Sequence, residues 1–164
     1  MLGIRGLDAF GLVHTVLGLG AVLFGVLIIA LPKGTPRHRG IGRAYAVAML
    51  LLNSTGLMIY DLSGRFGPFH VAALVSLGTI VAGVVLAFLR RPRGHWVEMH
   101  GMFMAWSYVG LLAALISEIA TRVPGVSFGV GATAATVIVV AGGALLIHTR
   151  VPTIARALAR DGTV

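Results

Sequence analysis

Six histidines in a chain without cysteine are the residues whose type could support chemistry. Without cysteine the chain cannot form disulfides, thiolate metal sites, iron–sulfur clusters or covalently attached heme. Any cofactor would therefore be held by histidine nitrogens, carboxylates and hydroxyls. Neutral imidazoles hold the iron of b-type heme and also bind zinc, so the composition is consistent with either cofactor.

Four of the histidines fall in two pairs, one expected on each side of the membrane. His14 and His70 lie near the starts of the first and third runs, and both are expected in the outer half of the membrane. His100 lies about one turn into the fourth run, and His38 precedes the second run, on the inner side. Two-heme membrane cytochromes pair histidines of alternate helices in this way. We therefore predict a heme b electron carrier, which would pass electrons across the bilayer, to a quinone or to a redox partner.

Within this prediction the outer pair, His14 and His70, is favoured as a single heme site. His38 is expected in a loop bounded by proline and glycine, before the second run begins, so the inner pair of His38 and His100 is less well placed.

Two other functions compete with the heme carrier. His14, His70 and either Glu118 or Asp61 would offer two nitrogens and one oxygen to zinc, with a fourth position open for water. That arrangement predicts a zinc-binding intramembrane protein or hydrolase, although no H-E-x-x-H pair supports it. The third possibility is a non-catalytic accessory protein whose histidines are structural. Whether the chain is an enzyme is left open by the sequence.

The elements that would position these residues are membrane helices. Hydrophobic residues make up 57% of the 164 residues and charged residues 11%, against about 45–50% and 25% in soluble domains, and mean hydropathy is +0.96. A soluble enzyme, a disordered chain and a DNA-binding domain are thereby excluded. About 20 apolar residues cross a bilayer as a helix. We predict one all-α integral membrane domain over residues 1–164, with five transmembrane helices at 10–31, 44–62, 67–89, 96–119 and 128–149.

The charged residues lie between these runs and indicate their direction. With five crossings one side receives ten basic residues, Lys33, Arg37, Arg39, Arg43, Arg90, Arg91, Arg93, Arg150, Arg156 and Arg160. The other side receives three, Arg5, Arg65 and Arg122. The positive-inside rule places the N-terminus outside and the C-terminus in the cytoplasm. The net charge of +8 therefore suits a plasma membrane protein that contacts anionic lipid head groups, and nucleic acid is not expected as a partner.

Glycine is the remaining unusual feature, with 23 residues in the chain. His14, Gly18, Ala21 and Gly25 share one face of the first predicted helix. Small residues allow close helix packing in lipid, and they would also leave room for a porphyrin beside His14. The sequence does not separate these two interpretations.

Two motifs resemble those of an uncharacterised membrane family, domain of unknown function 2306. The segment from His38 to Tyr45 reads HRGIGRAY and is similar to the HR-x-x-GR-x-Y pattern of that family. The segment from His100 to Tyr108 reads HGMFMAWSY and is similar to H-x-x-W-M-x-x-S-Y. The resemblance implies a membrane bundle and a shared set of histidines, including His14 and His70, but no particular activity. The chain departs from the family at Glu118, where many members have arginine.

Overall fold

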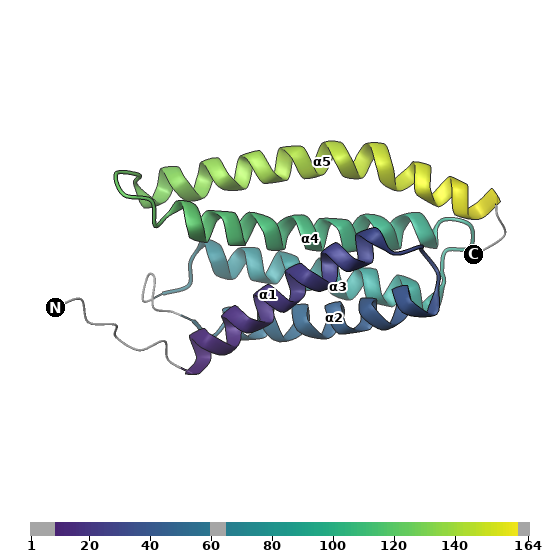
Figure 1. Ribbon diagram of the computed structural model, residues 1–164, viewed down its shortest axis with the longest axis horizontal. Helices are drawn as coiled ribbons and strands as arrows, with labels where there is room; N and C mark the ends of the chain where they lie inside the picture. The colour runs from purple at the N-terminus through teal and green to yellow at the C-terminus, as the bar shows by residue number, and fades with distance from the viewer. Residues whose placement is uncertain (1–8, 60–64, 161–164) are drawn as a thin grey trace. The chain divides into compact units, whose positions relative to one another are not determined.

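The computed structural model describes residues 9–59 and 65–160, and the regular secondary structure of this part consists of five α-helices (Figure 1). The helices are α1 (Ala9–Ala30), α2 (Pro36–Gly56), α3 (Pro68–Leu89), α4 (Trp96–Ala120) and α5 (Phe128–Arg160). The predicted all-α fold class is confirmed. Arg5, which was counted on the outer side, and Asp61, the alternative zinc ligand, lie outside the described residues.

Helix α2 begins earlier than predicted, at Pro36 instead of residue 44, and ends earlier, at Gly56. Thr35 is its N-cap and accepts a hydrogen bond from the backbone N–H of His38 (3.2 Å). Proline at the first helical position needs no N–H partner, so Thr35-Pro36 is a strong start signal. The prediction followed hydropathy alone and placed His38 in a loop. That placement was wrong, because His38 lies in the first turn of α2.

Helix α5 is longer than predicted and continues beyond residue 149 to Arg160. Pro152 lies inside it, where it removes one backbone hydrogen bond without ending the helix. The expected boundary at 149 marks the end of the apolar run and not the end of the helix. The segment with Arg156 and Arg160 is therefore a direct extension of α5.

Four of the described helices, α1, α3, α4 and α5, are long and apolar enough to cross a membrane. Helix α2 falls short because it combines the basic turn of Arg37, Arg39 and Arg43 with the polar end Asn53-Ser54-Thr55. Large apolar side chains such as Phe88, Ile138 and Leu145 are mostly exposed on the helix surfaces. Apolar surface of this extent is stable in contact with lipid and not with water, so the protein is membrane-embedded.

The described chain divides into two compact units, residues up to Leu77 and residues from Gly78 onward. In the first unit α1 packs along α2. The predicted small-residue face of α1 lies in this contact, since Ala21 is completely buried and a Cβ on Gly18 would lie 3.6 Å from Leu52. Between the two interpretations of that face, helix packing is the one that these contacts show.

In the second unit α4 and α5 lie side by side. They approach closely at Gly143, where an added Cβ would lie 2.5 Å from Val109 Cγ2. The buried Ser117 hydroxyl lies 3.0 Å from Thr136 Oγ1 and 3.2 Å from the Ala132 carbonyl oxygen. Small residues and interhelical hydrogen bonds of this kind hold helices together in lipid, where the hydrophobic effect does not.

Lys33 closes the C-terminal end of α1. Its ammonium group donates hydrogen bonds to the carbonyl oxygens of Ile28, Ile29 and Leu31, at 2.8–3.0 Å. Burial lowers the pKa of Lys33. A cation bonded to the last carbonyl groups of a helix satisfies acceptors that have no intrahelical partner. Lys33, expected only to orient the span, therefore also caps α1.

Candidate functional site

His14 is half-buried on α1 and bonds to the end of α2. Its Nδ1 lies 2.9 Å from Thr55 Oγ1, which in turn lies 3.0 Å from the Leu51 carbonyl oxygen and 2.9 Å from that of Leu52. The hydroxyl has one proton, and the carbonyl oxygens can only accept, so the arrangement is satisfied when Thr55 donates to them and accepts from Nδ1–H. In the neutral ring the lone pair is then on Nε2.

Gly56 makes room for this ring. A Cβ on Gly56 would lie 3.3 Å from His14 Cε1, a tight contact that a larger side chain would worsen. Thr55 and Gly56 were not among the predicted site residues. The only sequence signal for them is a polar and a small residue at the end of an apolar run, which does not identify the helix they would contact.

His100 has the same tautomer as His14, through a different partner. Its Nδ1 lies 2.7 Å from the Gly83 carbonyl oxygen on α3. A carbonyl oxygen only accepts, so Nδ1–H is the donor and the neutral ring again carries its lone pair on Nε2. Gly83 allows α3 to come this close, because a Cβ there would lie 2.8 Å from Met104 Sδ.

His70 has the opposite arrangement. It is buried at the third position of α3, and its Nδ1 accepts a hydrogen bond from the backbone N–H of Gly67 (3.1 Å). In the neutral ring the proton is therefore on Nε2. This is the reciprocal half of a capping box, in which the side chain at the third helical position accepts from the N-cap N–H. Phe66 lies against the ring, with centroids 5.0 Å apart. The start signal Gly67-Pro68 is visible in the sequence, but the capping role of His70 was not predicted.

The remaining histidines are at helix ends or on exposed surface. His38 is half-buried in the first turn of α2, His95 is the exposed N-cap of α4 without a side-chain capping bond, and His148 is exposed on α5. The structure joins His14 to α2, His100 to α3, and His70 to the turn before its own helix.

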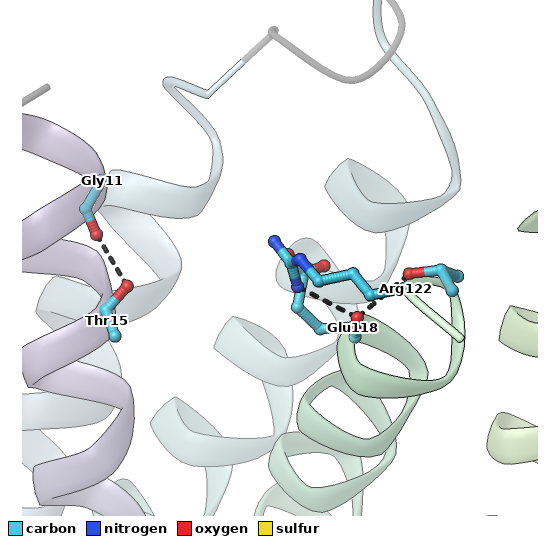
Figure 2. Close-up of polar contacts among 5 residues, drawn as sticks. Gly11, Thr15, Glu118 and Arg122 are labelled. Carbon is cyan, nitrogen blue, oxygen red and sulfur yellow. Dashed lines mark hydrogen bonds and ion pairs between the residues drawn. The ribbon is translucent and has the colours of Figure 1, made fainter. Parts of the chain in front are cut away.

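Glu118, the carboxylate of the zinc hypothesis, forms an ion pair with Arg122, four residues further along the chain. Its Oε1 lies 2.5 Å from an Arg122 guanidinium nitrogen, and the same guanidinium donates to the Glu118 carbonyl oxygen at 3.0 Å (Figure 2). Figure 2 also shows Thr15 donating to the Gly11 carbonyl oxygen on α1, at 2.8 Å. Both side chains of the ion pair are substantially exposed. Over residues 9–59 and 65–160 no group of three or more histidine or acidic side chains lies close enough to hold a metal ion.

His14 and His100 are thus the two histidines whose contacts suit ligand chemistry. A histidine that binds a metal or heme iron through Nε2 commonly donates its Nδ1–H to an oxygen, which fixes the tautomer and the ring orientation. The hydroxyl of Thr55 and the carbonyl of Gly83 supply that oxygen. Each ring could hold heme iron or accept a proton at Nε2.

Comparison with known proteins agrees with the motif resemblance. Residues 11–155 match the family described as "Predicted membrane protein (DUF2306)". No curated protein and no solved structure gives a significant match. The matched region includes His14, His38, His70 and His100 and covers most of the chain. The protein therefore belongs to this family of membrane proteins.

Proposed function

We propose that the protein is a b-type heme electron carrier in which His14 and His100 are axial ligands. The observation that supports this proposal is the pair of Nδ1–H hydrogen bonds, 2.9 Å to Thr55 and 2.7 Å to Gly83, because they place the lone pair of each neutral ring on Nε2. Electrons would pass between the two membrane faces or to a quinone or a redox partner.

The second ligand of each heme is taken from the sequence prediction, His70 for the outer heme and His38 for the inner one. To bind iron through Nε2, His70 would have to release the Gly67 N–H and move its ring proton from Nε2 to Nδ1. His38, the candidate partner of His100, lies in the first helical turn of α2. The zinc alternative, with His14, His70 and Glu118 as ligands, would require Glu118 to leave Arg122.

A reduced-minus-oxidised absorbance spectrum of the detergent-purified full chain, expressed with ample heme, tests the proposal. We expect the Soret and alpha bands of b-type heme, with about two hemes per chain if both sites fill. About one heme per chain would restrict the proposal to one of the two histidines. A spectrum without heme bands would contradict it, and elemental analysis of the same sample would then test for zinc.

We further propose that all five helices cross the plasma membrane, with the N-terminus outside. Helix α2 has 21 residues, about 31 Å at 1.5 Å per residue, which is enough to cross the hydrocarbon core. Its basic first turn would lie among the cytoplasmic head groups with Lys33. If α2 did not cross, Arg90, Arg91 and Arg93 would face outward, against the positive-inside rule. In this topology the cytoplasmic arginines contact anionic lipid head groups.

Reporter fusions test this topology. A cytoplasm-active and an export-active reporter fused after residues 34, 66, 93 and 125 are expected to give cytoplasmic, external, cytoplasmic and external signals in that order. The sites at 66, 93 and 125 are decisive, because all three change side if α2 does not cross. An external signal at 93 would show that the five-span topology is wrong.

A further inference from the structure

Helix α5 extends beyond its apolar run into a basic segment. The run from 128 to 149 measures about 33 Å at 1.5 Å per residue, which matches a hydrocarbon core of about 30 Å. Residues 150–160 continue the same helix. They are therefore expected at the level of the lipid head groups.

This extension has two different faces. Val151, Ala155 and Leu158 recur at helical spacing and are half-buried. Val151 faces α4, since a Cβ on Gly101 would lie 3.1 Å from its Cγ1. The other face exposes Thr153, Arg156, Ala157 and Arg160. Val151 therefore anchors the start of the extension against α4, and the exposed face is the one that carries the two arginines.

The exposed face is hollowed. Thr153, Arg156, Ala157 and Arg160 line a hollow of about 250 Å³. The Arg156 Nε–H donates to the Pro152 carbonyl oxygen (3.1 Å), which holds this guanidinium along the helix. Ala157 is small, so space remains between the two arginines. Arginine presents its N–H groups in a fixed fork that matches phosphate oxygens.

We propose that this hollow binds the phosphate of an anionic phospholipid head group, with Arg156 and Arg160 as the cationic ligands. Its charge is complementary to that head group and its position is at the membrane surface, where such lipids are concentrated. The proposal deepens the lipid contact of the proposed topology, because it assigns that contact to particular residues. It is independent of heme binding.

The test uses the full chain in detergent, titrated with phosphatidylglycerol and, separately, with zwitterionic phosphatidylcholine, with bound lipid counted by native mass spectrometry. The variant Arg156→Gln/Arg160→Gln is expected to lower the apparent affinity for phosphatidylglycerol roughly 30-fold, at about 1 kcal/mol per arginine. Ala157→Leu keeps every charge but fills the hollow, and it is expected to lower the affinity as well. Phosphatidylcholine binding is expected to be unchanged in both variants.

The matched control is Arg91→Gln/Arg93→Gln, which removes the same charge from two exposed arginines of the α3–α4 loop. An equal loss of affinity in this control, together with normal binding by Ala157→Leu, would show general surface attraction and overturn the proposed site. Competition by inorganic phosphate at the concentration of the lipid would show a free-phosphate site and overturn the lipid assignment. If the unmodified chain bound no phosphatidylglycerol at all, the broader head-group contact would fail too.

Discussion

Alanine at position 143 is expected to destabilise the protein, whereas alanine at the adjacent position 142 is not. A Cβ on Gly143 would lie 2.5 and 2.6 Å from the two γ-methyl groups of Val109, closer than carbon atoms can approach. Val109 is buried and β-branched, so its side chain cannot rotate away at low cost. The α4–α5 contact must therefore open, at a cost of about 1–3 kcal/mol, typical of an overpacked core.

Gly142→Ala is the matched control, because nothing lies within 4 Å of a Cβ added there. Its expected effect is neutral or stabilising by about 0.5–1 kcal/mol, since alanine favours the helix. Thermal unfolding in one detergent compares both variants with the unmodified chain, and Gly143→Ala/Val109→Ala is expected to recover part of the loss. Equal melting temperatures for the two single variants would contradict the close packing at Gly143.

Removal of either proposed ligand is expected to remove one heme. In His14→Ala and in His100→Ala the heme content should fall by about one per chain, because alanine has no side-chain nitrogen that could bind iron. His148→Ala is the control, since His148 is exposed on α5. Thr55→Val is expected to weaken heme binding at His14 by about 10- to 100-fold, because it removes the acceptor of the Nδ1–H bond without changing the ligand.

Heme-to-protein ratios from pyridine hemochrome spectra measure these losses, and circular dichroism of each variant verifies that the helices are retained. Unchanged heme content in both histidine variants would refute His14 and His100 as ligands. Equal losses in His148→Ala would point to loss of folding instead of loss of a ligand. Glu118→Gln is expected to leave the heme ratio unchanged, because Glu118 is paired with Arg122.

The helices were predicted from local hydropathy and length, and the structure shows where these two properties predict the helix bounds and where they do not. Four of the runs of about 20 apolar residues coincide with helices that are long and apolar enough to cross a membrane, because length and hydropathy are sufficient to make a segment helical in lipid. Helix α2 differed because its start depends on the Thr35 cap and Pro36, which hydropathy does not report. Helix α5 differed because a helix can continue past its apolar run.

The sequence by itself determined that this is a helical membrane protein with histidines inside the spans, since side-chain type and spacing are properties of one segment. Only the tertiary structure decided the hydrogen-bond partners of His14, His100 and His70. The partner atoms belong to other segments of the chain: Thr55 for His14, Gly83 for His100 and the Gly67 N–H for His70. The same reason separates Gly142 from Gly143. They are identical neighbours in the sequence, and only the position of α4 places Val109 against one of them.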